Sequence, residues 1–130
     1  MSVYNYYHDL PVYKVCREFR KKVSLTVRKC FPKAEEYLLK SQALRASRSI
    51  TANIAEGFGR YHYQENIQFC RQARGSLDET LEHMVTAYDE NYLQKELLTE
   101  LNTDYKECRK QLNTYIKYLK NAKQGGTNNQ

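Results

Sequence analysis

The chain contains only two prolines, Pro11 and Pro32, so nearly all of it is free to form long uninterrupted helices. Its apolar residues recur at steps of three and four along most of the sequence. The strict alternation of apolar and polar residues that indicates a strand is nowhere sustained. The sequence therefore predicts an all-α protein.

The apolar pattern divides the chain into four amphipathic segments. The first should have Asp9 as its N-cap and Pro11 in its first turn, where the missing N–H of proline costs little. Gly57 and Gly59 should end the second, because glycine commonly follows a helix C-terminus. The predicted helices cover about residues 9–31, 41–58, 63–90 and 95–122. Four helices joined by short connections predict an antiparallel up-and-down four-helix bundle.

Residues 1–122 are predicted to form this single domain, because a chain of 130 residues suits one core. Residues 123–130 offer no substantial apolar side chain to bury, so we expect a disordered tail there. No apolar run approaches the roughly 18 residues that a membrane span requires. The N-terminus also lacks the basic start and apolar run of a secretory signal, which predicts a cytoplasmic protein.

The four cysteines are far apart in the sequence, and each falls at or beside an apolar position of a predicted helix. We interpret them as reduced core residues rather than as a disulfide framework. The chain has no C-x-x-C or H-x-x-x-H pair, and its three histidines are scattered. We therefore expect neither a metal site nor a cofactor. The cysteines are Cys16, Cys30, Cys70 and Cys108.

Gly75 is an anomaly in the middle of the third predicted helix, where glycine costs about 1 kcal/mol relative to alanine. Ser76 and Glu79 could form a capping box that starts a new helix at this point. We favour one continuous helix in which Gly75 lets a partner backbone approach closely.

The net charge of +6 is unevenly distributed along the chain. Residues 1–60 carry a net charge of +7, residues 61–90 carry −4, and residues 91–130 carry +3. The first and fourth predicted helices are thus basic, whereas the third is acidic. Basic stripes attract phosphate backbones without reading base sequence. The alternatives are ordinary solvated side chains, or pairing of the acidic helix with a basic helix of the same or a neighbouring subunit.

One stretch of the second predicted helix is distinctive in its small residues and spaced arginines. From residue 41 to residue 60 it reads SQALRASRSITANIAEGFGR, and ARGSLDE follows at residues 73–79. Through these motifs, from Leu10 to about Leu119, the chain resembles a bacterial four-helix-bundle family. That family was first noticed as proteins encoded by intervening sequences within large-subunit ribosomal RNA genes.

Relatives of this family include the accessory variability proteins of diversity-generating retroelements. By analogy with those relatives, the resemblance implies a homo-oligomer, expected to be a pentamer, whose basic ring binds nucleic acid and a partner reverse transcriptase without doing chemistry. The family usually has two adjacent arginines before the first alanine of the second helix. Here Leu44 precedes Arg45, and Arg48 stands one helical turn after residue 44, on the same face. Thr51 occupies a position where proline is frequent.

These observations together predict a non-enzymatic homo-oligomer that binds RNA or DNA through basic helix faces. The alternative is a scaffold that docks a partner protein such as a reverse transcriptase, with nucleic-acid binding incidental. The residues expected to contact phosphate are Arg17, Arg20, Lys21, Arg45, Arg48, Arg60, Lys106, Arg109 and Lys110.

The polar residues of the second predicted helix could suggest catalysis, but we interpret them as structural. Ser49 has neither a histidine nor a lysine in its row that could activate it as a nucleophile. Asn53 and Glu56 should instead bond to other helices or a neighbouring subunit, with Arg60, Arg71 or Arg74 as partners for Glu56. We assign the same structural role to two glycines. The predicted structural motif thus consists of Ser49, Asn53, Glu56, Gly57 and Gly75.

The chain has twelve tyrosines and no tryptophan, and several tyrosines crowd the N-terminus. Tyrosines near basic residues can stack on unpaired bases, but more often they seal subunit interfaces. We favour the interface role for the N-terminal group, which comprises Tyr4, Tyr6, Tyr7 and Tyr13.

Overall fold

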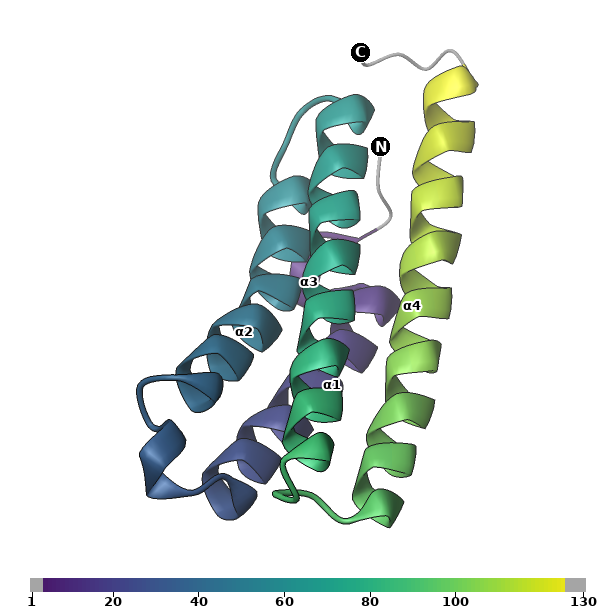
Figure 1. Ribbon diagram of the computed structural model, residues 1–130. Helices are drawn as coiled ribbons and strands as arrows, with labels where there is room; N and C mark the ends of the chain where they lie inside the picture. Colours follow the sequence, from purple (N-terminus) through teal and green to yellow (C-terminus); the bar gives the residue numbers. More distant parts are fainter. Residues whose placement is uncertain (1–3, 126–130) are drawn as a thin grey trace.

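The structure, a computed structural model, describes residues 4–125 and contains four long helices and no strand within them (Figure 1). This confirms the predicted all-α class. Two short 3-10 helices precede α1 and α2, namely η1 (Tyr7–Asp9) and η2 (Lys33–Glu35). The long helices are α1 (Pro11–Cys30), α2 (Leu39–Phe58), α3 (Tyr63–Asp89) and α4 (Lys95–Gln124).

The helix ends differ from the prediction at three places. Helix α1 begins at Pro11 with Leu10 as its N-cap, so Asp9 is not the cap but part of η1. A residue before proline is driven out of the helical region, and Leu10 accordingly has extended dihedral angles of φ −65° and ψ 132°. Helix α2 begins two residues early, at Leu39, whose N–H donates to Glu35 Oε1 at 3.1 Å.

The third difference concerns the C-terminal end of α4. The helix continues to Gln124, two residues beyond the predicted end at residue 122. The remainder of the predicted tail, residues 126–130, lies outside the described residues. Of the residues predicted to form the tail, residues 123 and 124 are helical and Gly125 forms a turn.

Helix α3 passes through Gly75 without interruption, which confirms one continuous helix. The Ser76 hydroxyl caps nothing and instead donates to Ser49 Oγ of α2 at 2.9 Å. A Cβ added at Gly75 would meet nothing within 4 Å, so no backbone of the described chain approaches it there. That part of the prediction for Gly75 finds no support within this chain.

Gly57 of α2 has the opposite environment. A Cβ added there would lie 2.7 Å from Asn66 Oδ1 and 2.8 Å from Phe69 Cβ, both on α3. Real Cβ atoms do not approach other atoms so closely, and only glycine allows α2 and α3 to come together at this level.

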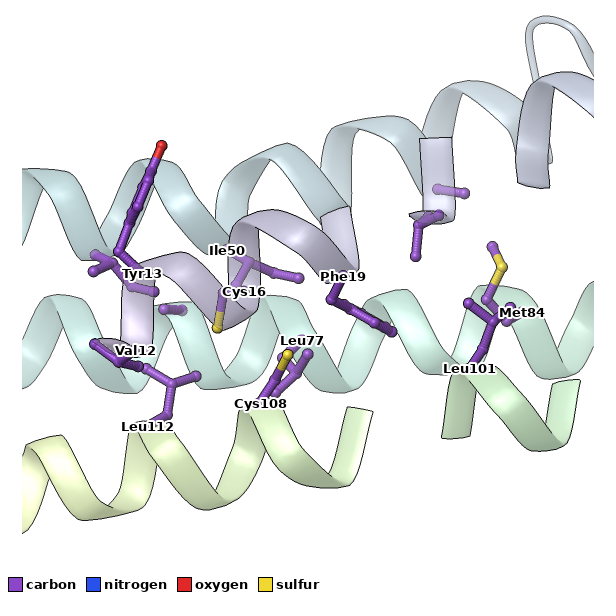
Figure 2. Packing of buried hydrophobic residues seen from close by; sticks show 14 of the residues in the cluster. Val12, Tyr13, Cys16, Phe19, Ile50, Leu77, Met84, Leu101, Cys108 and Leu112 are labelled. Carbon is purple, nitrogen blue, oxygen red and sulfur yellow. The ribbon is translucent and has the colours of Figure 1, made fainter. Parts of the chain in front are cut away.

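The core lies between helices that are neighbours in sequence, and α4 also packs against α1 (Figure 1). Figure 2 shows that apolar side chains of all four helices converge in the interior of the bundle. Burying each large aliphatic or aromatic side chain contributes about 1.5–3 kcal/mol, so this interior stabilises the bundle. The labelled side chains are Val12, Tyr13, Cys16, Phe19, Ile50, Leu77, Met84, Leu101, Cys108 and Leu112.

The four cysteines are free thiols, as predicted, and three of them are fully buried. Burial raises the pKa of the Cys70 thiol to about 12. A hydrogen bond with Cys108 and burial raise the pKa of Cys16 far above its usual value. Thiols held protonated in this way are poor nucleophiles, so these side chains act as core residues. Across residues 4–125, no helix combines the length and apolar character needed to cross a membrane.

Candidate nucleic-acid interface

The basic residues of α1 and α2 meet at an open hollow on the surface of the molecule. The hollow has a volume of about 810 Å³ and lies along α1, with Arg48 of α2 and Glu107 of α4 contributing at its sides. Arg20, Lys21 and Arg48, which the sequence predicted as phosphate contacts, line the same hollow. The structure therefore brings these three predicted residues together.

Two arginines of α1 are held in place by hydroxyl groups rather than by carboxylates. Arg20 Nη1 donates to Thr51 Oγ1 of α2 at 2.8 Å, and Arg28 Nη1 donates to Ser24 Oγ at 2.6 Å. A hydroxyl orients a guanidinium but carries no charge to compensate it. Both arginines therefore keep a full positive charge at the surface. Thr51 gains a clear role, since proline at that position would provide no hydroxyl.

Arg45 and Arg48 lie exposed on α2, and neither guanidinium has a hydrogen-bond or ion-pair partner among residues 4–125. Arg48 also lines a second, shallower pocket of about 460 Å³, together with Arg45 and Lys40. Arg48 thus connects the hollow along α1 to the surface that carries Arg45. We call the group formed by Arg20, Lys21, Arg28, Arg45 and Arg48 the α1–α2 surface.

Weak ion pairs lie at the N-terminal side of this surface. Arg17 Nη1 is 3.8 Å from Glu18 Oε2, and Lys21 Nζ is 3.5 Å from the same oxygen. All three side chains are at least half exposed, and exposed pairs at these distances stabilise a protein very little. Arg17 and Lys21 remain available to an external anion.

Lys22 is the exception on α1, because two carboxylates of α4 neutralise it. Its Nζ lies 2.6 Å from Glu100 Oε1 and 2.7 Å from Asp104 Oδ2. Burial by itself lowers the pKa of Lys22, but its hydrogen bonds to Asp104 and Glu100 outweigh this and raise it. Lys22 therefore joins α1 to α4 and adds no free charge.

The predicted cations of α4 lie apart from the α1–α2 surface. Arg109 Nη1 donates to both carboxylate oxygens of Asp78 on α3, at 2.8 and 3.1 Å, and the Tyr105 hydroxyl donates to Asp78 Oδ1 at 2.6 Å. Lys106 and Lys110 are exposed, and no residue of the described chain pairs with them. The structure thus divides the predicted set into two groups and ties Arg109 to a carboxylate.

Arg60 lies at the end of α2 and is also paired. Its Nη2 lies 2.7 Å from Glu56 Oε2, and its guanidinium stands 4.9 Å from the centre of the Phe69 ring. Arg60 is thus one of the three partners predicted for Glu56. Arg74, another of those candidates, instead donates to Asn113 Oδ1 of α4 at 2.7 Å.

Within the described residues, the Asn53 amide bonds inside its own helix and not to another helix; the predicted bond to a neighbouring subunit stays a prediction. Asn53 Nδ2 donates to the Ser49 carbonyl and to Ser49 Oγ, each at 2.9 Å, within α2. The bond between helices comes from Ser76, which donates to Ser49 Oγ. The four-residue spacing of Ser49 and Asn53 could have indicated the local bond, because residues four apart face each other on a helix.

Arg28 was not included among the phosphate contacts predicted from the sequence, and Leu25 was overlooked. Leu25 is 64% exposed and lines the hollow between Lys21 and Arg28. Its apolar side chain departs from the inward stripe of α1. That departure from the apolar pattern was the available signal.

Comparisons with known proteins identify the family of the chain and support its fold. The family model described as 23S rRNA-intervening sequence protein matches residues 8–114. The fold is similar to a crystal structure from Bacteroides thetaiotaomicron, of a protein with unknown function from the S23 ribosomal protein family. That match has a TM-score of 0.75 and 24% identity, and it covers 82% of this chain and 95% of the other. No curated protein matches the chain. Because the family model spans most of its length, the chain belongs to the 23S rRNA-intervening sequence protein family.

Proposed function

We propose that this protein is a non-enzymatic homo-oligomer that binds the backbone of RNA or DNA through its α1–α2 surface. The observation that carries the proposal is the way the cations of this surface are held. Arg20 and Arg28 are oriented by hydroxyls, and Arg48 has no partner among the described residues. Guanidinium groups with uncompensated charge are the side chains best suited to phosphate oxygens.

The affinity of each cation for phosphate depends on the partner that it would lose on binding. A guanidinium already paired with a carboxylate must give up that partner before it can neutralise a phosphate. Arg20 and Arg28 would lose at most one hydrogen bond to an uncharged hydroxyl, and no compensating charge. We therefore expect the α1–α2 surface to bind first, with Arg17, Lys106 and Lys110 adding weaker long-range attraction.

We propose no catalytic role for the polar residues of α2. Ser49 Oγ accepts hydrogen bonds from Asn53 Nδ2 and from the Ser76 hydroxyl. An amide and a hydroxyl cannot remove its proton, so Ser49 has no general base in these contacts. Free thiols at all four cysteines suit a reducing compartment, which supports a cytoplasmic location.

Exposed tyrosines near the N-terminus support the homo-oligomeric part of the proposal. Tyr6, which precedes η1, and Tyr7, its first residue, are exposed, and Tyr7 packs edge-on against Tyr13. The family resemblance leads us to expect a pentamer. Removing residues 1–8 should therefore lower the number of subunits in the oligomer, measured as its mass in solution. An unchanged mass would exclude these tyrosines from the interface.

We also propose the order and direction in which the four helices follow one another in the bundle. The connections between successive helices lie at alternating ends of the molecule in Figure 1. This arrangement supports an antiparallel up-and-down bundle.

Protein docking is the second candidate function, with a reverse transcriptase as one possible class of partner. Two large aromatic side chains favour it, because Tyr37 is 89% exposed and Tyr61 is 76% exposed. Exposed tyrosines are common at protein interfaces. Replacing Tyr37 and Tyr61 with serine should weaken partner binding and leave nucleic-acid affinity unchanged.

The direct test of nucleic-acid binding is an affinity titration with a fluorescent oligonucleotide at several salt concentrations. Each phosphate neutralised on a single strand should add about 0.7 to the slope of log affinity against log salt. We expect a slope of at least about 2, because several cations of the surface act together. Binding that does not change with salt would overturn the backbone-contact proposal.

A further inference from the structure

The hollow along α1 combines charge with an apolar side chain in a way that phosphate contact alone does not require. Leu25 is 64% exposed at this site. Lys21 lies one turn before it on the same face of α1, and Arg28 lies one turn after it. Single exposed leucines are common, but this one lines a hollow that four uncompensated or weakly paired cations also line.

The apolar part of the hollow is larger than Leu25 alone. Val15, which is half-buried, also lines it, and the core residue Phe19, which is 2% exposed, lies beneath, so Leu25 and Val15 supply the accessible apolar floor between the basic side chains of α1. A phosphate has no use for such a floor. The faces of a nucleobase do, because a base gains by stacking or packing against apolar and aromatic groups.

Carboxylates at the edge of the hollow complete the pattern. Glu107 of α4 and Glu18 of α1 line it together with the cations. Glu107 accepts a hydrogen bond from Gln111 Nε2 at 3.1 Å, and this bond leaves further lone pairs free. Carboxylates repel phosphates, yet they accept hydrogen bonds from the amino groups of bases such as cytosine.

We propose that this hollow receives an unpaired nucleotide, with its base over Leu25 and its phosphates against Arg20, Arg28 and Arg48. The inference rests on the proposed function and names its substrate class as single-stranded nucleic acid. In a duplex both faces of every base are covered by stacking, so a duplex can offer this site only its phosphates. RNA and DNA single strands share the chemistry, and binding assays with both would distinguish them.

The test compares fluorescence anisotropy for a single strand and a duplex of equal length and equal salt, with RNA and DNA versions of each. We expect the single strand of at least one sugar type to bind about tenfold more tightly than the duplex. Equal or tighter duplex binding would overturn the single-strand inference and leave the proposed function standing. Absence of binding to every probe would overturn both.

Leu25→Ala separates base contact from charge. This variant should lose about three- to tenfold in single-strand affinity while its salt slope and duplex affinity stay unchanged, because every cation remains. The matched control is Leu38→Ala, since Leu38 is 59% exposed but lies outside the hollow. It should bind like the parent protein. Equal effects of the two variants would contradict the assignment.

An oligonucleotide with abasic sites provides a second test that uses the unmodified protein. It keeps the phosphates and removes the bases, so it should bind the parent protein no better than the intact strand binds Leu25→Ala. Undiminished affinity for the abasic strand would overturn base contact. A lower solution mass of Leu25→Ala with unchanged affinity would place Leu25 in a subunit interface and equally overturn the inference.

Discussion

The α1–α2 surface and the α3–α4 side of the molecule both carry arginines, but they hold them differently. On the first, Arg20 and Arg28 are oriented by the hydroxyls of Thr51 and Ser24. On the second, Arg109 is bound by both oxygens of Asp78. The same side chain thus keeps its charge available on one side and stabilises the contact between two helices on the other.

This difference shows that a basic stripe in a sequence does not by itself define a binding surface. Lys22 follows Lys21 directly on the basic helix α1, yet Glu100 and Asp104 neutralise it. What decides the role of a cation is its partner in the folded chain. The same distinction should govern how each cation contributes to nucleic-acid affinity and to stability.

Charge reversal should give the largest effect. Replacing Arg20, Lys21 and Arg48 with glutamate should lower oligonucleotide affinity about a hundredfold at low salt, because three attractive charges become repulsive. Anisotropy titrations measure the loss, and thermal unfolding checks that the bundle survives. The matched control reverses Lys106, Lys110 and Lys117 of α4, which should cost only a few-fold. Equal losses in the two triple variants would erase the distinction between the two sides.

The two helical glycines test the packing of α3 independently of charge. Gly57→Ala should lower the free energy of unfolding by about 2 kcal/mol, because its Cβ would clash with Asn66 and Phe69. Gly75→Ala should raise it by up to about 1 kcal/mol, because the site is open and alanine favours the helix. Denaturant unfolding measures both. If Gly75→Ala also lowers the solution mass, a second subunit approaches α3 there; a destabilised Gly75→Ala monomer would contradict the open site.

A buried tyrosine between α3 and α4 should make the stability of the protein depend on pH in the alkaline range. Burial raises the pKa of Tyr115 to about 12, against an opposing hydrogen bond from Asn66. Its proton is bound more tightly in the folded chain, so its stabilising contribution is complete below pH 10 and is lost as the pH rises toward 12. At pH 11 the proton linkage amounts to about 1 kcal/mol. Tyr115→Phe should remove that part of the alkaline loss in thermal unfolding, and an identical alkaline profile would contradict it.

Freeing Arg109 from Asp78 should change affinity and stability least, but it compares the same arginine with and without a carboxylate partner. Asp78→Ala removes the carboxylate that binds Arg109 and Tyr105, which should cost about 0.5–1 kcal/mol of stability because the pair is partly exposed. The freed guanidinium should raise oligonucleotide affinity up to about threefold at low salt. Reduced affinity in a folded Asp78→Ala protein would show that the pair itself supports binding.

Much of the fold could be predicted from the sequence, because helix formation depends on local spacing. The steps of three and four along residues 95–122 correspond to α4, and the small residues of α2 correspond to its close approach to α3. The N-cap at Asp9 was wrong because Pro11 acts on the residue before it, an effect that outweighs capping preference.

The candidate site was less predictable, since it depends on contacts between distant residues. Arg20 and Thr51 are 31 positions apart, as are Arg109 and Asp78, and charge counts cannot distinguish a hydroxyl partner from a carboxylate partner. Leu25 could be noticed only as an apolar residue outside the inward stripe. Its neighbours in the hollow come from three helices, which only the folded chain brings together.

The most direct test of the central claim is size-exclusion chromatography with light scattering, run with and without an oligonucleotide at low and high salt. The account predicts a stable oligomer that retains the oligonucleotide at low salt and releases it at high salt. An oligomer that leaves the oligonucleotide free at every salt concentration would contradict nucleic-acid binding and make the α1–α2 surface either solvated side chains or a protein docking site.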